Sequence, residues 1–233
     1  MESMIDSILK VENLQVELDG RIILQNLSFD LQERETLVIL GPNGAGKTVL
    51  LRTLLGLVPH QGTIWWKDGL KIGYVPQRVV VQKDLPVTVE DFFDLQNVSR
   101  NAVVEAIRQV GIQETAFRTK PLGLLSSGQL QRTLIASALA QRPDVLLFDE
   151  PMAGIDVGGE ETVHGVLRRI HQESHLTIVA VTHDLSVVSG DATHALCINK
   201  PPYCYGTPKE VLTPANLQTI YGDSVKFFPH VHE

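Results

Sequence analysis

The sequence has few cysteines, no long hydrophobic run and no excess of basic residues, and each absence excludes a class of protein. Two cysteines in 233 residues, Cys197 and Cys204, cannot form a disulfide framework, so we interpret both as reduced thiols. No apolar run approaches the length of about 20 residues that spans a bilayer, and residues 1–6 do not resemble a signal peptide. The net charge of −7 offers no basic surface to nucleic acid, so any phosphate binding must be local.

A glycine-rich loop between a predicted strand and a predicted helix is the most informative stretch of the chain. An apolar run at 37–40 precedes the loop and a helix-forming run at 49–55 follows it. The loop itself matches the pattern G-x-x-x-x-G-K-[ST] and consists of Gly41, Pro42, Asn43, Gly44, Ala45, Gly46, Lys47 and Thr48. Its backbone N–H groups and the helix N-terminus favour a phosphate chain, Lys47 suits the outer phosphates, and the Thr48 hydroxyl suits Mg²⁺. The alternative is a structural turn between a strand and a helix. Such a turn would explain the glycines, but it would not explain the pair Lys47–Thr48 at the start of the helix.

Hydrophobic periodicity predicts strands on both sides of this loop. Residues 8–31 alternate with a period of two around Asp19-Gly20, which favours a tight hairpin, and residues 63–66 form a further short strand. We expect a core strand at 71–77 that ends at Gln77. Continuous apolar runs at 145–148 and 177–182 predict strands that are buried on both faces of a parallel sheet.

Helical periodicity dominates residues 86–141, which we expect to form a helical subdomain. Thr88 and Asp91 have the spacing of a capping box, and Gly111 should end a helix over residues 102–110. A second helix is expected at 130–141, after Leu125-Ser126-Ser127-Gly128-Gln129. Later helices are predicted at 158–171 and after Thr207 and Thr213, each of which is followed by a proline.

Four of the predicted strands end in residues that carry chemistry. They end at the phosphate loop, at Gln77, at Asp149-Glu150 and at His183. Ligands of open parallel sheets bind outside the carboxyl ends of the strands, so we expect these groups to converge on one site. There Asp149 would control Mg²⁺ and Glu150 would act as a base for the attacking water. Each of these groups alone could have a purely structural role, such as a buried histidine or a helix cap. Their combination with a complete phosphate loop favours a nucleotide site.

In the order of these motifs the sequence resembles the nucleotide-binding subunits of ATP-binding cassette (ABC) transporters along nearly its whole length. Residues 125–129 look like the family signature, and Gln77 looks like the glutamine of the Q-loop. Residues 145–150 look like the Walker B strand with its catalytic glutamate, residues 151–156 like the D-loop, and His183 like the switch histidine. The tail at 205–212 and residues 217–222 most resemble the ATPases of manganese, zinc and iron importers.

The resemblance implies an α/β fold and a set of site residues. The fold would be a P-loop NTPase core with a parallel sheet, an antiparallel β subdomain and a helical subdomain, together one nucleotide-binding domain over residues 1–233. The implied ligands are ATP and Mg²⁺. Glu150, His183 and Gln77 would be catalytic, and the metal would be held by Thr48, Gln77 and Asp149. Besides the phosphate loop, the residues implied to bind nucleotide are Leu18, Ser126, Ser127, Gly128 and Gln129.

Two positions depart from the family pattern. The signature usually has glycine where Ser127 stands, and serine keeps the backbone N–H while restricting φ. Leu18 aligns with the aromatic residue that usually stacks on adenine, so the choice between ATP and GTP is less certain.

The resemblance also implies partners and a place in the cell. Two copies would close head to tail around two ATP molecules, and the dimer would lie in the cytoplasm on the inner face of the membrane, attached to permease subunits. An extracytoplasmic substrate-binding protein would deliver the cargo, which we expect to be a metal ion. A soluble ABC ATPase of iron–sulfur cluster assembly remains an alternative. A nucleic-acid repair ATPase is disfavoured, because the insert after Gln77 is short and the chain is acidic.

Overall fold

The chain folds into two compact units. The computed structural model describes residues 7–77, 79–112, 117–149, 165–166, 168–170, 176–182, 188, 190, 192–199 and 203–222. Unit 1 comprises Met1–Lys67 and Ala180–Glu233, and unit 2 comprises Asp68–Val179. Unit 2 is therefore one continuous segment, whereas unit 1 is assembled from the two ends of the chain.

Unit 1 contains an antiparallel sheet of β1 (Ser7–Leu18), β2 (Arg21–Gln32) and β4 (Gln61–Trp66), in the order β2-β1-β4. The predicted hairpin at Asp19-Gly20 is confirmed. Both turn residues have positive φ, 50° and 71°, which suits the right-handed twist of the strands that they join. The predicted short strand is also confirmed as β4, and Trp66 donates its indole N–H to the Leu54 carbonyl at 2.9 Å.

A second set of strands in unit 1 brings together residues that are far apart in sequence. β3 (Thr36–Leu40) pairs in parallel with β8 (His194–Cys197), and β8 pairs in the antiparallel direction with β9 (Cys204–Gly206). All five residues of β3 are buried, as the apolar run predicts. The helices of this unit are α1 (Lys47–Leu54), α7 (Pro208–Val211) and α8 (Pro214–Tyr221). The two proline-initiated helices are confirmed, with Thr207 and Thr213 as their N-caps.

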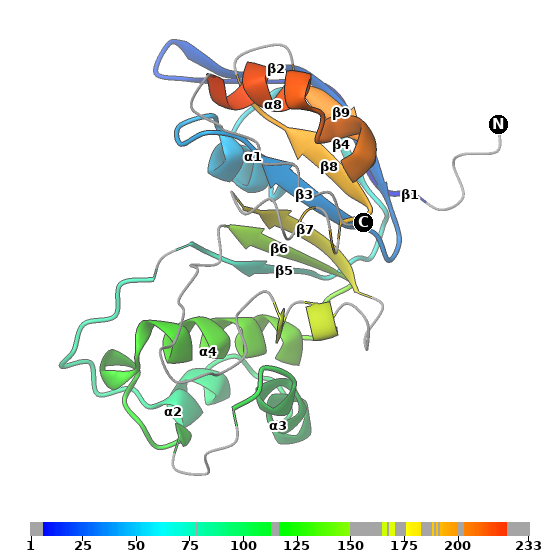
Figure 1. Ribbon diagram of the computed structural model, residues 1–233. Helices are drawn as coiled ribbons and strands as arrows, with labels where there is room; N and C mark the ends of the chain where they lie inside the picture. Colours follow the sequence, from blue (N-terminus) through cyan, green and yellow to red (C-terminus); the bar gives the residue numbers. More distant parts are fainter. Residues whose placement is uncertain are drawn as a thin grey trace, which may run out of the picture. The chain divides into compact units, whose positions relative to one another are not determined.

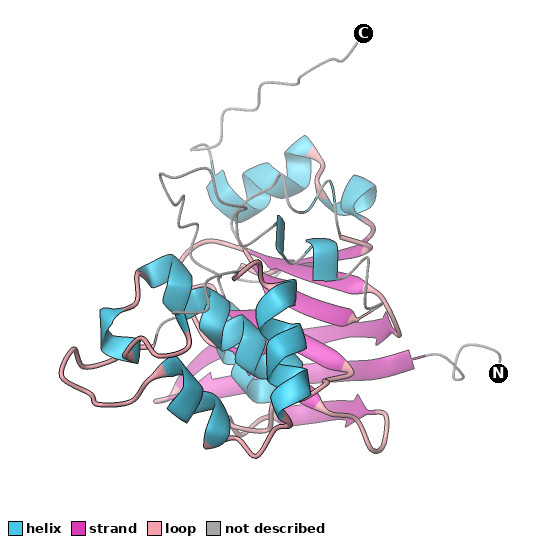
Figure 2. Cartoon of the chain, turned by 90° about the horizontal axis from the view of Figure 1, so that it is seen from below, coloured by secondary structure: helices cyan, strands magenta, loops and turns pink. Residues whose placement is uncertain are grey.

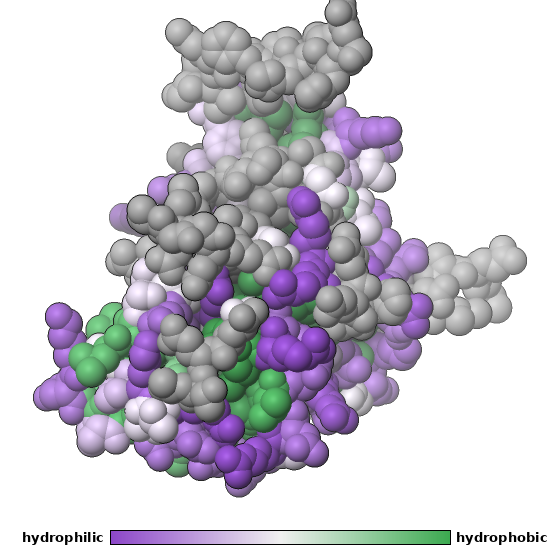
Figure 3. Space-filling model, turned by 60° about the horizontal axis from the view of Figure 1, so that its bottom comes forward, coloured by the Kyte–Doolittle hydropathy of each residue, from purple (hydrophilic) through white to green (hydrophobic). Residues whose placement is uncertain are grey.

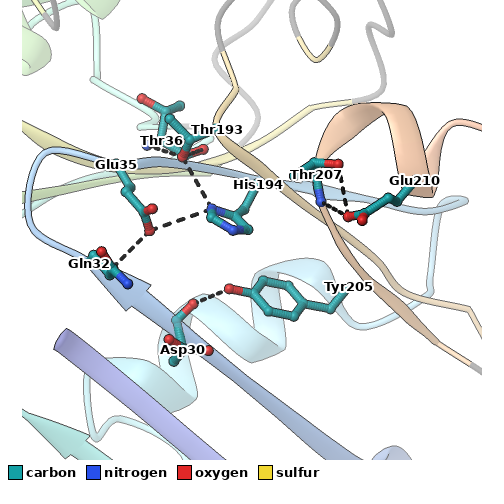
Figure 4. Close-up of polar contacts among 9 residues, drawn as sticks. All are labelled: Asp30, Gln32, Glu35, Thr36, Thr193, His194, Tyr205, Thr207 and Glu210. Carbon is teal, nitrogen blue, oxygen red and sulfur yellow. Dashed lines mark hydrogen bonds and ion pairs between the residues drawn. The ribbon is translucent and has the colours of Figure 1, made fainter. Parts of the chain in front are cut away.

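Polar contacts attach the C-terminal segment of unit 1 to β2, to the start of β3 and to the turn between them (Figure 4). Thr36 donates its backbone N–H to the Thr193 hydroxyl at 3.0 Å, and the Thr193 N–H donates to the Thr36 carbonyl at 2.9 Å. His194 lies 3.5 Å from a Glu35 carboxylate oxygen and stacks on the Tyr205 ring, whose hydroxyl donates to the Asp30 carbonyl. Polar contacts thus attach β8 to the start of β3 and β9 to β2, and the His194–Tyr205 ring contact joins β8 to β9.

Unit 2 contains a parallel pair, β5 (Ile72–Val75) and β6 (Val145–Asp149). β6 is buried throughout, as predicted. β5 ends two residues before Gln77, earlier than the predicted strand, because Pro76 has no N–H with which to continue a ladder. β7 (Thr177–Val181) is confirmed as a buried strand; it crosses the boundary between the units, and the Thr182 N–H after it donates to the Ile39 carbonyl at 3.2 Å.

The helices of unit 2 gather on one side of β5 and β6 (Figure 1), and Figure 2 shows the helices of the chain from below. They are α2 (Val89–Asp94), α3 (Arg100–Gln109), the 3-10 turn η2 (Leu122–Leu124) and α4 (Ser127–Ala140). The Thr88–Asp91 capping box is present, and Gly111, with a φ of 72°, follows the end of α3 as predicted. α4 begins three residues earlier than predicted, because Ser126 caps it.

The helix predicted at 158–171 falls largely outside the described residues. Residues 165–166 and 168–170 are helical, and Val166 and Ile170 are buried. Among the residues that are described, no helix is both long enough and apolar enough to cross a membrane.

Candidate functional site

The glycine-rich loop of unit 1 joins β3 to α1, as the sequence predicts. Gly46 is the N-cap of α1 in the left-handed conformation, with a φ of 98°, and no side chain caps the first turn. The Ala45 N–H donates to the Pro42 carbonyl at 3.2 Å and the Leu50 N–H donates to the Gly46 carbonyl at 2.8 Å, so the loop turns tightly into the helix. A helix start without a side-chain cap, preceded by a compact loop, has the geometry of an anion site.

Lys47 is the cation at the start of α1. Its side chain is buried, and the ammonium donates to the Gly41 carbonyl at 2.9 Å and to the Pro42 carbonyl at 3.1 Å. These bonds hold Nζ within the loop itself, where it can act as a point charge toward phosphate oxygens. Thr48 follows it at the second helical position and is partly buried.

The first glycine of the loop is needed for a close approach between two backbone segments. A Cβ at Gly41 would lie 2.0 Å from the Ile198 carbonyl oxygen, which comes from the residue after β8. The Ile198 N–H donates to the Leu40 carbonyl at 2.7 Å, so this segment continues the β3–β8 ladder to the edge of the loop. Burial raises the pKa of the Tyr221 hydroxyl, which lies beside both Cys197 and the Gly41 backbone. β8 and α8 thus form one wall of the phosphate loop.

The other wall of the loop comes from β2. A Cβ at Gly46 would lie 2.9 Å from Ile23 Cγ2 and 3.1 Å from Leu24 Cδ2. Leu18, which the resemblance aligns with the adenine-stacking residue, lies at the end of β1, pairs with Arg21 across the hairpin and is 36% exposed. Its side chain is therefore available to a ligand.

In unit 2, Asp149 ends β6 and is almost completely buried, at 2% exposure. The Tyr74 hydroxyl donates to Asp149 Oδ2 at 3.2 Å, from the strand that pairs with β6. Gln77 follows two residues after the end of β5 and is partly buried. The sequence predicted Asp149 and Gln77 at strand ends, and the described geometry adds Tyr74 as the hydroxyl that holds the carboxylate.

The signature residues form the first turn of α4. The Ser126 hydroxyl accepts the Gln129 N–H at 3.2 Å, and the Gln129 side chain in turn accepts the Ser126 N–H at 3.2 Å. Ser126 and Ser127 are exposed, while Gly128 and Gln129 are partly buried. This reciprocal cap fixes the helix start and leaves its first turn directed to solvent.

Three groups of predicted residues lie outside the described part of the chain. They are the expected base Glu150, the expected switch histidine His183, and the D-loop at 151–156. Their roles remain predictions from the sequence.

Comparison with known proteins identifies the family. The sequence profile described as "ABC transporter" matches residues 24–153, more than half of the chain. This range contains the phosphate loop, the capped helix α4 and Asp149 in sequence order. The chain belongs to the ABC transporter family. It is an ATPase that binds ATP and couples its hydrolysis to transport, and its fold is the ABC ATPase fold.

Individual relatives of the ABC family agree over nearly the full length. The chain is 34% identical to the "Zinc import ATP-binding protein ZnuC" of Pseudomonas savastanoi pv. phaseolicola, covering 99% of this chain and 88% of the relative. It is 36% identical to the ZnuC of Photorhabdus laumondii subsp. laumondii, covering 97% of this chain and 90% of the relative. A solved inward-facing structure of a metal-chelate type ABC transporter matches with a TM-score of 0.81 and 29% identity, covering 93% of this chain and 89% of that one.

Sequence reasoning missed the residues that surround the loop without belonging to its motif. Ile23 lies in a strand that precedes the phosphate loop, and this position could have suggested a contact with the loop. The alternating pattern of the strand, however, does not distinguish Ile23 from its neighbours. Ile198 and Tyr221 carry no sequence signal, because their importance depends on how β8 and α8 pack.

Proposed function

We propose that this ABC ATPase powers the uptake of a transition-metal ion, zinc, manganese or iron, through separate permease subunits in the membrane. The observation that carries the proposal is the full-length similarity, at 34–36% identity, to two zinc import ATP-binding proteins. The similarity to a metal-chelate type transporter supports the same class of cargo. The metal is the transported substrate and not a cofactor of this chain. We place the protein on the cytoplasmic face of the membrane, attached through the permease.

Within this function we assign the phosphate loop to the β- and γ-phosphates of ATP. The uncapped first turn of α1 and the compact loop before it supply backbone N–H groups, and Lys47 supplies the charge. Leu18 would give adenine an aliphatic contact in place of an aromatic one. An aliphatic surface does not distinguish one base from another by stacking. We therefore expect the preference for ATP over GTP to be only small.

The oxygen-donor side chains predicted at the site are suited to Mg²⁺. Thr48 offers a hydroxyl, Gln77 an amide oxygen and Asp149 a carboxylate, and hard oxygen ligands of this kind are those that Mg²⁺ takes in nucleotide sites. Asp149 is buried and accepts a hydrogen bond from the Tyr74 hydroxyl, and a cation nearby would offset the cost of burying its charge. When bound, Mg²⁺ would neutralise charge on the phosphates. The protein's own part is to hold these oxygens in place.

Hydrolysis requires a base, and we assign that role to Glu150. It follows the buried strand β6 directly, and a carboxylate there can accept a proton from the water that attacks the γ-phosphate. Gln77 and His183 would orient the water and the γ-phosphate. The signature residues Ser126 to Gln129 would complete the site of a second copy, in a head-to-tail homodimer.

Exposed hydrophobic side chains on unit 2 offer a surface to the permease. Val80 is 91% exposed and Leu124 is 66% exposed. Figure 3 shows hydrophobic residues at the surface among hydrophilic ones. Gly123 lies against the backbone of Gln82 and Lys83, where a Cβ would meet the Gln82 carbonyl at 2.5 Å, so the segment that follows Val80 packs beside η2. We propose that these two exposed side chains contribute to the surface that meets the permease.

Metal accumulation in cells tests the proposal. Deleting the gene should reduce the uptake of radioactive zinc, manganese or iron. The wild-type chain should restore uptake and a Lys47→Ala variant should not. A Leu124→Glu variant should retain ATPase activity as a purified chain and lose co-purification with the permease, which separates the docking surface from the catalytic machinery.

The rival function in iron–sulfur cluster assembly predicts a different result. The deletion would then leave the uptake of all three metals unchanged and lower the activity of iron–sulfur enzymes, and the chain would co-purify with soluble assembly proteins. That outcome would overturn the transport proposal while leaving the assignment as an ABC ATPase intact.

A further inference from the structure

The two cysteines lie opposite each other at the C-terminal edge of unit 1. Cys197 of β8 pairs with Cys204 of β9 in the antiparallel ladder. Directly opposed residues in such a ladder have Cα atoms about 4.5–5.5 Å apart, which falls within the range of about 4.4–6.8 Å that a disulfide requires. Both cysteines are free in this structure.

Both side chains point to the same face of the sheet. The neighbours Tyr203 and Tyr205 contact β2, since the Ser28 N–H donates to the Tyr203 hydroxyl and the Tyr205 hydroxyl donates to the Asp30 carbonyl. Residues alternate along a strand, so Cys204 faces the opposite way. There it packs against a cluster of buried residues that includes Cys197. The two thiols therefore lie in contact, and strand pairing already fixes their backbones.

The two thiols differ in access and in acidity. Cys197 is fully buried, and its S–H donates to Cys204, which raises the pKa of Cys197 and lowers that of Cys204. Cys204 is only partly buried and lies on β9, the last strand in the order β3-β8-β9. A partly exposed thiol that receives a hydrogen bond, next to a buried thiol, is the arrangement of an attacking and a resolving cysteine.

We propose that Cys197 and Cys204 form a reversible disulfide site that takes a small-molecule disulfide as its oxidant and weakens nucleotide binding when it is oxidised. With glutathione disulfide, the Cys204 thiolate attacks one sulfur, forms a mixed disulfide and releases one glutathione thiolate. The Cys197 thiol then loses its proton, attacks Cys204 Sγ and releases the second glutathione. Two electrons pass from the cysteines to the oxidant, and the two protons are taken up by the released thiolates.

The site is linked to the phosphate loop through Ile198. This residue follows Cys197, its N–H bonds the Leu40 carbonyl, and its carbonyl occupies the space that Gly41 leaves open. Bridging imposes disulfide geometry on the Cys197 side chain, and any backbone adjustment at Cys197 passes directly to Ile198, whose carbonyl has no free space at Gly41. Tyr221 lies beside both Cys197 and Gly41 and so contacts both ends of this connection.

Intact-mass measurement of the purified chain in a glutathione redox buffer tests the covalent step. The wild type should lose the mass of two hydrogen atoms and recover it on reduction with dithiothreitol. Cys204→Ser should stay unmodified, because Cys197 is buried. Cys197→Ala should stop at a stable adduct of one glutathione. A wild type that stays unmodified, or that accumulates the glutathione adduct without bridging, refutes the site.

Titration of the same samples with ATP in the absence of magnesium tests the link to the loop. The dissociation constant of the bridged wild type should rise by about tenfold, equivalent to about 1.4 kcal/mol of binding free energy, and should return after reduction. Cys204→Ser should bind equally well in both buffers. Equal affinity of the bridged and reduced wild type would refute the regulatory link. None of these readouts depends on the transported metal, so the result is independent of the proposed cargo.

Discussion

Asp149 depends on a neighbouring hydroxyl for the orientation of its carboxylate. It is buried at the end of β6, and Tyr74 reaches it from β5 with a bond of 3.2 Å. A hydrogen bond to a charged group contributes about 1.5–3 kcal/mol. We infer that Tyr74 is a positioning residue for the carboxylate that we assign to Mg²⁺.

Tyr74→Phe should therefore raise the Mg²⁺ concentration that gives half-maximal ATPase activity by several-fold. Binding of ATP without magnesium should change little, because the phosphate loop is untouched. Tyr203→Phe is the matched control, since it also removes a tyrosine hydroxyl that takes part in a hydrogen bond, here by accepting the Ser28 N–H in unit 1. An unchanged magnesium requirement in Tyr74→Phe would show that Asp149 does not need this bond.

Glu150→Gln should keep ATP binding and lower the rate of hydrolysis by about 10²-fold or more, because general base catalysis typically contributes 10²–10⁴-fold. Phosphate release and nucleotide binding are measured on the same sample. Release at nearly the wild-type rate would remove Glu150 from the role of base.

Leu18→Tyr should tighten ATP binding by roughly 0.5–1.5 kcal/mol if Leu18 lies against the adenine, since an aromatic contact adds about that much beyond buried area. Glu17→Tyr is the control, because adjacent strand residues face opposite sides of the sheet. Calorimetric titration with ATP and with GTP separates an effect on the base from an effect on the phosphates. Equal affinities in the wild type and in Leu18→Tyr would mean that adenine is held elsewhere.

At the scale of elements, three helices in the described part of the chain begin with reciprocal side-chain caps. α2, α4 and α7 each have a capping box, with Thr88, Ser126 and Thr207 as the N-caps. In α2 and α4 two backbone N–H groups that the helix leaves unpaired are satisfied by side chains, and in α7 the Glu210 carboxylate accepts the Thr207 N–H at 2.8 Å. These short elements therefore have defined starting points, which matters most for α4, where the cap consists of signature residues.

Thr88→Ala should lower the free energy of unfolding by about 1 kcal/mol, within the range of 0.5–2 kcal/mol for lost N-caps. The hydroxyl accepts the Asp91 N–H at 3.2 Å, and alanine leaves that donor without its partner. Thr88→Ser keeps the hydroxyl and should restore most of the stability. Urea unfolding followed by circular dichroism measures both variants.

The same cap predicts a dependence on pH. Hydrogen bonds from the Thr88 hydroxyl and backbone N–H lower the pKa of Asp91 below its ordinary value. A lowered pKa means that the carboxylate stabilises the folded state above the ordinary value, and that this contribution is lost as the pH falls through the lowered one. Asp91→Asn should therefore be less stable than the wild type at neutral pH, and the difference should disappear in acid.

The elements that could be predicted from the sequence are those with a local signal. The Asp19-Gly20 hairpin, the Thr88 cap and the buried runs at 145–148 and 177–182 all have one, and all are confirmed. β8 and β9 were not predicted, because they are short and depend on pairing with β3 and with each other. The same reason applies to the candidate site. The motif of the phosphate loop could be predicted from the sequence, whereas the residues that surround the loop, Ile23, Ile198 and Tyr221, are placed there only by packing.

At the scale of the whole molecule, the exposed start of α4 predicts association of two chains. Ser126 and Ser127 lie at a helix N-terminus that favours an anion, and in the proposed homodimer the phosphate comes from the other copy. Glu150→Gln with Mg-ATP should therefore sediment as a dimer and return to monomers when ATP is removed.

Adding Ser126→Arg to that background should abolish the dimer and leave nucleotide binding to each chain intact, since the arginine obstructs the interface and not the phosphate loop. Ser126→Ala is the control, because it removes the cap without adding bulk and should still dimerise. A Glu150→Gln chain that stays monomeric with ATP, both alone and with the permease present, would contradict the head-to-tail arrangement.

The pairing of β3 with β8 also determines when this protein can finish folding on the ribosome. Thr36 and Thr193 hydrogen-bond across 157 residues, so the phosphate loop leaves the exit tunnel long before the strand that forms its wall. At roughly 5–20 residues per second, synthesis of that interval takes about 8–30 s. During this time unit 2 can fold, because it is one continuous segment. The backbone groups along the edge of β3 stay unpaired until β8 is synthesised, and other strands could pair with them. Nascent chains that stall before residue 193 should therefore be the species that chaperones need to protect.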